Sequence, residues 1–339
     1  MKDEITLAFT GDVMLGRGVN EAVRLNSPDW PWGDMVESLK GADRRFINLE
    51  CVIAAAGRPW SRTPKTFLFK ADPVAVETLK HAGIDFVSLA NNHSLDFEDE
   101  ALVEMLGRLD AAGIARAGAG RDLSEAAKPA FLEAGGRRIG VVSITDNEPV
   151  WAAAQGIPGV NYWLVTLGAA NFAKVEAMIE DARRQADLVI LSAHLGPNMV
   201  EEPAPVFRRF ARAAVDAGVD IFHGHSAHVF QGIEIYKDKV IIYDAGDFVD
   251  DYVVDPILRN DLSFLFLVKV RGRGIAGVEL LPTHITDYQV NQAEGALAEH
   301  ALVRMSALCD RLGTAVERAG GRLYIPVPGK ENRRAAKNG

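Results

Sequence analysis

Short apolar runs alternate with segments of helical spacing over the first two thirds of the chain. Residues 5–10 and 187–193 are mostly apolar, are too short for helices and end at polar residues. Residues 98–112 and 204–217 instead carry apolar side chains at helical spacing. Because continuous apolar runs of about four to eight residues are typical of strands buried on both faces, the alternation predicts a mostly parallel sheet with helices on its faces. The same pattern predicts further strands at residues 46–49, 84–90, 114–117 and 138–145, the last pairing with 130–133, and further helices from residue 73 and at 169–186.

Beyond residue 228 the apolar runs follow one another with only short turns between them. The sequence Lys-Asp-Lys at 237–239 is one such turn. Short turns join neighbouring antiparallel strands, so this part of the chain is predicted to be antiparallel. The expected strands lie at residues 232–236, 240–243, 264–270 and 277–281.

No internal repeat or low-complexity linker divides the chain, so we expect one domain over residues 1–328 followed by a polar tail at 329–339. A C-terminal helix is expected at residues 294–318. Residues 54–70 are rich in Pro, Arg and aromatic side chains without periodicity, which predicts an ordered loop. Its basic side chains either line a pocket or are solvated, and we favour solvation. An acidic loop at 244–251 interrupts the antiparallel strands.

Composition places the chain among ordinary globular proteins. Its 339 residues are 48% hydrophobic and 24% charged, which is enough for a sizeable core. The net charge of -9 and the absence of a basic run before the tail argue against a nucleic-acid partner. Two acids near the N-terminus and no run of about 18 apolar residues predict neither a signal peptide nor membrane insertion, and hence a cytoplasmic protein. Cys51 and Cys309 are too few and too far apart to indicate disulfides or a thiolate zinc site.

Carboxylate, amide and imidazole side chains lie where the predicted strands end. Because the carboxyl ends of parallel strands meet at one edge of a sheet, we expect these side chains to come together. Five of the eight histidines belong to the group, which argues against unrelated core histidines, although His223 alone fits either interpretation. In chain order the group is Asp12, Glu50, Asn92, His93, His194, His223, His225 and His228.

Carboxylate, carbonyl and imidazole groups without thiolate suit Mn²⁺, Fe or Zn²⁺, and Ca²⁺ where oxygen ligands dominate. About six ligands are too many for one tetrahedral zinc ion and suit two ions that share a carboxylate. Such a pair would polarise an ester or amide and lower the pKa of a water between the ions. A metal-free acid–base pair of histidine and carboxylate is the alternative, and it leaves most of the group unexplained.

Six short motifs in this order resemble the CapA/PgsA family, which is named for poly-γ-glutamate capsule synthesis. They are GDVMLGR at 11–17, NLE at 48–50, LANNH at 89–93, GAGRD at 118–122, HLG at 194–196 and GHSAHV at 224–229. The resemblance covers residues 5 to about 250. It implies an α/β calcineurin-like metallophosphoesterase fold, with central mixed β-sheets flanked by helices in an αββα sandwich.

The resemblance also implies roles for individual residues. Asp12 matches the first aspartate ligand, Glu50 the bridging acid and Asn92 the amide ligand. His93 matches the histidine that protonates the leaving group, and Asp12 and His194 are counted with it as catalytic. The imidazole ligands of the metals are implied to be His194, His225 and His228.

The sequence departs from the metallophosphoesterase pattern at several positions. Met14 stands where an Asp-x-His motif places a histidine ligand, so one of the two metal sites lacks a ligand. Two residues, rather than one, separate His225 from His228. The acids Asp244 and Asp247 offer extra metal ligands or contacts to substrate, and a solvated turn is the rival interpretation.

Two further residues are assigned near the site. Arg17 pairs either with an anionic group of the substrate or with a surface acid. His223 is expected to lie behind the ligands rather than among them.

Three functions fit the sequence. The leading one is a metal-dependent hydrolase acting on an ester or amide of a peptide-like or γ-glutamyl-like polymer. The second is a metal-dependent peptide epimerase, in which a polarised carbonyl acidifies a Cα proton. The third is a non-catalytic subunit of capsule synthesis that binds polymer. The sequence indicates no oligomeric state.

Overall fold

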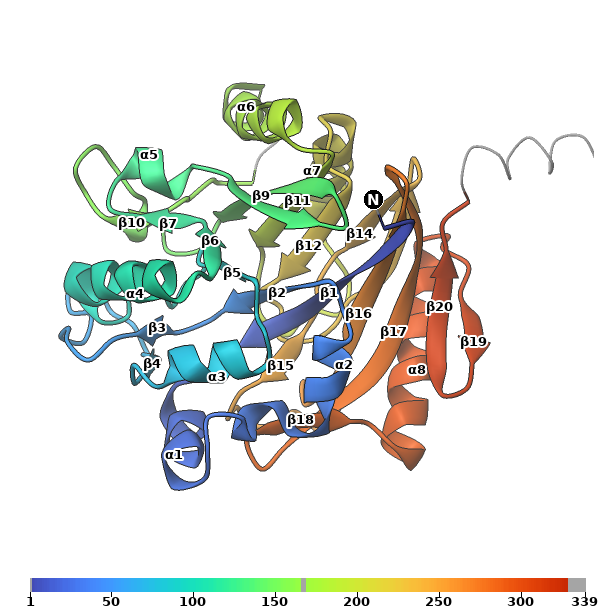
Figure 1. Cartoon of the computed structure of the whole chain (residues 1–339), viewed down its shortest axis with the longest axis horizontal. Coiled ribbons are helices and arrows are strands. Elements are labelled where there is room, and N and C mark those ends of the chain that lie inside the picture. Colours follow the sequence, from blue (N-terminus) through green and yellow to red (C-terminus); the bar gives the residue numbers. More distant parts are fainter. Residues whose placement is uncertain (1, 166–168, 329–339) are drawn as a thin grey trace, which may run out of the picture.

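The chain folds into two mixed β-sheets packed face to face, with helices on their outer sides (Figure 1). The computed structural model describes residues 2–165 and 169–328. Within them, the larger sheet contains ten strands, eight of them in one row, with β15 (Asp247–Val249) beside the fifth and β18 (Gln289–Gln292) beside the third. The row runs β19 (Glu317–Ala319), β20 (Arg322–Pro326), β17 (Gly274–Thr286), β16 (Leu262–Arg271), β1 (Glu4–Val13), β2 (Arg44–Leu49), β5 (Phe86–Ser88) and β6 (Ala115–Ala117).

The smaller main sheet has six strands among the described residues, four of them parallel with an antiparallel strand at each edge. Their order is β13 (Ile233–Tyr236), β14 (Lys239–Ile242), β12 (Ile221–His225), β11 (Leu188–His194), β9 (Arg137–Thr145) and β8 (Ala130–Ala134). Two short pairs lie outside the sheets, β3 (Val52–Ile53) with β4 (Lys70–Ala71) and β7 (Ala119–Gly120) with β10 (Gly159–Val160).

The central core lies between the sheets. Side chains of β1 alternate between the two faces of its sheet: Leu7 and Phe9 point into this core toward the second sheet, while Ala8 points toward the helices. The ring of Phe9 stacks on that of Phe46 with centroids 4.9 Å apart. Burying one such aromatic side chain contributes about 1.5–3 kcal/mol, so the apolar side chains between the sheets stabilise their packing against each other.

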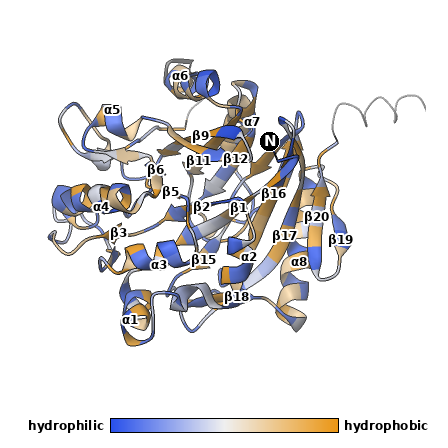
Figure 2. Cartoon of the chain, in the orientation of Figure 1, coloured by the Kyte–Doolittle hydropathy of each residue, from blue (hydrophilic) through white to orange (hydrophobic). Residues whose placement is uncertain are grey.

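Helices cover the outer faces. The outer face of the larger sheet packs against α1 (Arg17–Leu25), α2 (Val36–Lys40), α3 (Ala75–His81) and α4 (Glu98–Ala112), and the outer face of the second sheet against α6 (Ala169–Gln185) and α7 (Pro205–Asp216). Figure 2 shows hydrophobic residues along central strands such as β16 and hydrophilic residues on the outward sides of the helices. Shorter helices are η1 (Trp30–Met35), α5 (Leu123–Ala126) and η2 (Pro149–Trp151). Finally, α8 (Gly295–Arg311) packs against β16, β17 and β20 of one sheet and β13 of the other.

The predicted α/β class, with central mixed sheets between helices, is confirmed. The single mostly parallel sheet expected from the apolar runs is wrong, because the parallel strands form two blocks, one in each sheet. The predicted helices at 98–112 and 204–217 and the 130–145 hairpin are present as α4, α7 and the β8–β9 pair. The tail at 329–339 lies outside the described residues.

The C-terminal helix is shorter than expected. It ends at Arg311 rather than at residue 318, because the amide of Thr314 turns back to the carbonyl of Cys309 and Gly313 adopts a left-handed conformation with φ 75°. The following residues form the β19–β20 hairpin instead. Among the described residues, no helix has the length and apolar character to cross a membrane.

Candidate metal centre

The polar residues predicted at the strand ends meet where the carboxyl ends of both sheets come together. Strand pairing places them: parallel β1 and β2 align Asp12 with Asn48, and parallel β11 and β12 align His194 with His225. Parallel β15 adds Asp247 directly beside Asp12. The larger sheet therefore supplies carboxylates and the second sheet supplies imidazoles to one buried cluster.

One candidate ligand set consists of Asp12, His194 and His225. The two imidazole Nδ1 atoms are 2.9 Å apart, and Nδ1 of His225 is 3.9 Å from Oδ1 of Asp12. Burial lowers the pKa of His194 to about 4, and burial together with the neighbouring His194 holds the pKa of His225 well below its usual range. Both imidazoles are therefore neutral near pH 7, which is the form that binds metals.

The second set consists of Asp12, Glu50, His228 and Asp247. Nδ1 of His228 lies 2.8 Å from Asp247 Oδ1 and 3.3 Å from Asp12 Oδ2, and its Nε2 lies 3.8 Å from Glu50 Oε1. Asp12 belongs to both sets, whereas the resemblance implies Glu50 as the shared acid. The geometry favours Asp12 for that role and leaves Glu50 in one set.

Several oxygens of this cluster are buried with no hydrogen-bond partner among the described residues. A buried carboxylate oxygen without a partner is costly, and several of them at one point call for positive charge. The donor set of carboxylate, amide and imidazole groups therefore fits divalent cations. The atoms are Asp12 Oδ2, Glu50 Oε1, Asn92 Oδ1, Asp247 Oδ2 and Asp250 Oδ2.

The pKa values reflect this crowding of negative charge. Burial and the adjacent charge of Asp12 raise the pKa of Glu50 well above its usual range, and burial and Asp250 raise that of Asp247 in spite of His228. Burial alone would lower the pKa of His228, but the Asp247 and Glu50 carboxylates outweigh it and raise that pKa well above its usual range. The His228 imidazole thus lies at the point where the carboxylates attract positive charge.

A chain of hydrogen bonds behind the first set fixes the tautomer of His225. The carbonyl of Thr10 only accepts, so His223 Nε2 donates to it at 2.7 Å. Burial lowers the pKa of His223 to about 4, so its Nδ1 is an acceptor, 3.4 Å from the Ser192 hydroxyl. Ser192 in turn accepts from His225 Nε2 at 2.9 Å, which leaves the His225 Nδ1 lone pair facing the cluster. His223 thus lies behind the ligands, where it was expected.

The two asparagines after β5 have different surroundings. Asn91 is structural, because its side chain donates to Asn48 and to the Leu49 carbonyl and accepts from the amide of His93. Asn92 instead has a buried amide oxygen with no partner in the part of the chain described, so it is the one that fits a metal.

His93 stands beside the cluster and is oriented by two neighbours. Its Nδ1 is 2.6 Å from Oδ2 of Asp96, and its ring stacks on Phe69 with centroids 3.9 Å apart. Sequence reasoning missed Asp96, although its position three residues after His93 was a usable signal. Burial raises the pKa of Asp96 to about 8, and burial together with Lys65 holds the pKa of His93 well below its usual range.

Met14 does not take part in the centre. Its side chain is fully buried in the outer core, and its sulfur accepts a hydrogen bond from the amide of Gly16 at 3.0 Å. Asp247 enters the second set from the neighbouring strand β15 instead. The missing histidine is thus matched by an extra carboxylate.

Asp244 holds the turn that carries His228. One of its oxygens accepts from the amide of Ala227 at 2.7 Å and the other from that of Gly246 at 2.8 Å. Ser226 and His228 both have positive φ, 120° and 58°, so the two-residue spacing before His228 forces an unusual turn that these bonds stabilise. Asp244 therefore supports a ligand and lies outside both sets.

A pocket of about 480 Å³ opens beside the cluster. Asn92, His93 and His228 line it, together with Arg17 and Lys65. The loop at 54–70 therefore contributes to the site. The expectation that its basic residues are solvated is wrong for Lys65. The side chain of Lys65 is only 7% exposed, because Glu148, Asp96 and Trp151 enclose it.

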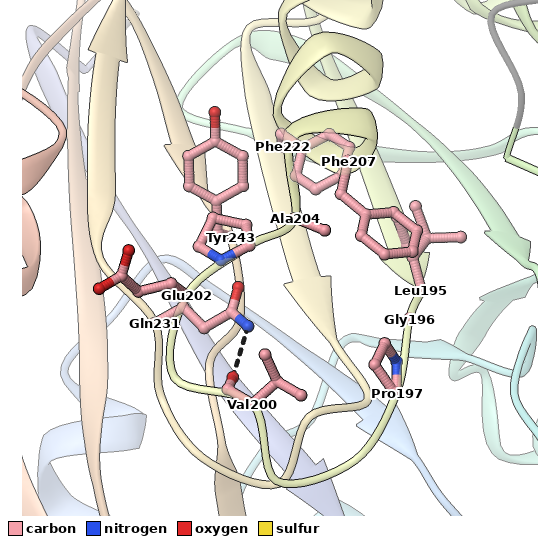
Figure 3. A pocket seen from close by; sticks show the side chains of 12 residues that line it. Leu195, Gly196, Pro197, Val200, Glu202, Ala204, Phe207, Phe222, Gln231 and Tyr243 are labelled. Atoms are coloured by element: carbon pink, nitrogen blue, oxygen red, sulfur yellow. Dashed lines mark hydrogen bonds between the residues drawn. The ribbon is translucent and has the colours of Figure 1, made fainter.

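A second, largely apolar pocket of about 40 Å³ lies behind the loop that follows β11 (Figure 3). Phe207 and Phe222 line it, and the side-chain Nε2 of Gln231 donates a hydrogen bond to the Val200 carbonyl at 2.7 Å. This cavity is too small for a peptide, and its packing fixes the loop next to His194.

Two mixed sheets whose strand ends gather carboxylates and imidazoles define an α/β protein with a candidate metal centre. The chain belongs to the bacterial capsule synthesis protein family PGA_cap, whose profile matches residues 6–252, as the motifs predict. It is 31% identical to a probable polyglutamine synthesis accessory protein of Mycobacterium tuberculosis, over 96% of this chain and 97% of that one. It is 27% identical to the capsule biosynthesis protein CapA of Bacillus anthracis, over 89% of this chain and 72% of that one.

The solved structures that align with this chain share less of its sequence than these relatives do. A hypothetical protein from Thermus thermophilus has 17% identity and a TM-score of 0.48, covering 83% of this chain and 100% of that one. A phosphatase from Mycoplasma pneumoniae has 16% identity and a TM-score of 0.48, covering 87% of this chain and 93% of that one.

Proposed function

We propose that the protein is a metal-dependent hydrolase of CapA type that cleaves an ester or amide bond in a peptide-like or γ-glutamyl-like substrate. The observation that carries the proposal is the buried cluster with unpartnered oxygens, two of whose residues, Asn92 and His228, line a pocket shared with His93. Two divalent ions, of Mn, Zn, Fe or Ca, would polarise the scissile carbonyl and lower the pKa of water there.

The chain's own residues supply position and proton transfer. Asp96 holds Nδ1 of His93 and Phe69 holds its ring, so Nε2 is the atom left to serve the pocket. Because burial raises the pKa of Asp96 to about 8, its protonated carboxyl donates to Nδ1 and the ring proton of His93 sits on Nε2; we assign Nε2 the transfer of this proton to the leaving group, with the proton of Asp96 passing to Nδ1. Tyr252, whose hydroxyl donates to Glu50 Oε2 at 3.2 Å, holds the carboxylate and closes the pocket on that side.

The reaction is tested with purified protein supplied with Mn²⁺, Zn²⁺ or Ca²⁺ and incubated with γ-linked and α-linked glutamate peptides in D₂O. Hydrolysis creates new chain ends, which mass spectrometry detects, and this is the expected result. Deuterium at Cα in chains of unchanged length would show that the reaction is epimerisation rather than hydrolysis. Polymer binding with neither change would identify a non-catalytic subunit of capsule synthesis and overturn the enzymatic proposal.

Substitution of His93→Gln tests the assignment of the acid. We expect kcat to fall by about 10²–10⁴-fold while metal content stays the same, because His93 is outside both ligand sets. His81→Gln, at an imidazole that is 42% exposed on α3, is the matched control and should leave kcat unchanged. Full activity in His93→Gln would show that another group transfers the proton.

A further inference from the structure

The pocket at the metal centre has two cationic side chains that hydrolysis itself does not require. Lys65 reaches it from the loop at 54–70 and Arg17 from the start of α1. Both lie close enough to His93 to lower its pKa, with Lys65 the stronger of the two. In a chain of net charge -9, two positive groups in the same pocket as the proposed acid are a specific feature of this site.

Lys65 is held in place but not saturated. Its Nζ donates to Glu148 at 3.1 Å, and its 3.7 Å separation from Asp96 Oδ1 is longer than a hydrogen bond. The ammonium also lies 4.7 Å from the centre of the Trp151 ring. An ammonium has three N–H donors, so at least one is available to a ligand in the pocket that Lys65 lines.

Arg17 is held in a similar way, by an acid and an aromatic ring. Its Nε lies 3.2 Å from Asp251 Oδ2, and its guanidinium carbon is 5.3 Å from the centre of the Phe69 ring that supports His93. Its terminal nitrogens make no hydrogen bond to the described residues. They remain free for a bidentate contact with an oxyanion.

The backbone at Arg17 supports a functional role over a structural one. The residue has φ 51°, a left-handed conformation that is costly for a non-glycine residue, and it stands between Gly16 and Gly18. A third glycine would relieve this strain. Keeping an arginine there, 40% exposed at its side chain, is consistent with a demand for its charge at the pocket.

We propose that Lys65 and Arg17 form a carboxylate-binding subsite that selects substrates with a free carboxylate next to the reacting bond. The subsite deepens the proposed function and rests on it for the identity of that bond. Phe67 and Val253 also line the pocket and are 59% and 93% exposed. They offer apolar contact to methylene groups, whereas Lys65 and Arg17 offer contact to a carboxylate. A carboxylate on a short aliphatic stem, as in a γ-linked glutamyl peptide, therefore fits both groups of residues.

Calorimetric titration of the full, Mn²⁺-loaded chain with γ-glutamylglutamate and with its fully amidated analogue tests the subsite. We expect the acid to bind at least tenfold more tightly than the amide. Lys65→Gln and Arg17→Gln should each reduce this preference several-fold, and Lys65→Arg should retain it because the charge is kept. Glu148→Gln should increase the preference, since it removes the acid that competes for Lys65.

Arg62→Gln is the matched control. Arg62 lies in the same loop and its side chain is 50% exposed, but it pairs with Glu98 and Asp99 outside the pocket lining, so the preference should not change. Equal binding of acid and amide would overturn the subsite, because the pocket would then not recognise the carboxylate. A preference that survives in both Lys65→Gln and Arg17→Gln would also overturn it, because the metal centre alone would then bind the carboxylate. Selective binding without any turnover would instead contradict the proposed function and leave the subsite standing.

Discussion

Among single side chains, the most informative contact is the hydrogen bond between Ser192 and His225. Because Ser192 accepts from Nε2, it keeps Nδ1 of His225 free of a proton and aimed at the first ligand set. We predict that Ser192→Ala lowers the affinity for the first-set ion by about 10–100-fold, the usual effect of removing a hydrogen bond behind a ligand. Competition with a chromogenic chelator measures this affinity.

Ser88→Ala is the control for that substitution. Ser88 is likewise a buried serine on a parallel strand, β5, but its hydroxyl has no partner within residues 2–165 and 169–328. Its replacement should leave metal affinity unchanged. Equal affinities in both variants would mean that the tautomer of His225 is set by other contacts.

Residue types at strand ends were enough to predict which side chains meet, since the ends of parallel strands share an edge. They did not predict Lys65 or Asp96, because neither lies at a strand end. Lys65 reaches the pocket from an irregular loop, and Asp96 acts through His93. Side-chain direction in such segments depends on tertiary packing, which the sequence pattern does not encode.

Among the strands and helices, the short strand β15 increases the chemical difference between the two ligand sets. By adding Asp247 it gives the second set three carboxylates and one imidazole, whereas the first set has one carboxylate and two imidazoles. Oxygen-rich sets favour Mn²⁺ or Ca²⁺ and imidazole-rich sets favour Zn²⁺ or Fe. We predict that protein given equal Zn²⁺ and Mn²⁺ binds one of each, measured by mass spectrometric metal analysis.

Asp247→Asn tests the contribution of β15. The change keeps an oxygen and the size of the side chain but removes the charge, so Mn²⁺ content should fall while Zn²⁺ content is retained. Asp251→Asn is the matched control on the same segment, because Asp251 lies outside both sets and contacts Arg17 and the amide of Gly18. Loss of both ions in Asp247→Asn would instead indicate that one strand supports the whole centre.

The sequence predicted the strands and helices in the first two thirds of the chain better than those at the end. Apolar runs and helical spacing located most of them there because each element is buried against its neighbours. The hairpin of β19 and β20 was missed, since all three residues of β19 are exposed and show no alternation, and only the pairing with β20 defines the strand. The division into two sheets was likewise implied by the family resemblance and not by periodicity.

For the molecule as a unit, the centre joins the two sheets. Asp12 and Glu50 come from the larger sheet and His194 and His225 from the second, so ions bound by both sets would connect the layers. We therefore propose that residues 1–328 form one domain, in which β20 returns from the C-terminal end to pair with β17. A single domain should unfold in one transition.

Scanning calorimetry of chelator-treated and metal-loaded protein checks both points together. Each ion at about 100 times its Kd adds roughly 2.7 kcal/mol to the free energy of unfolding, so two ions together should raise the Tm of a domain of this length by about 8 °C. Relief of the repulsion among the buried carboxylates is part of the binding free energy of each ion. One transition that moves as a whole is expected in both samples. Two separate transitions, with only one of them moved by metal, would show that the sheets unfold independently and that the ions bind to one of them.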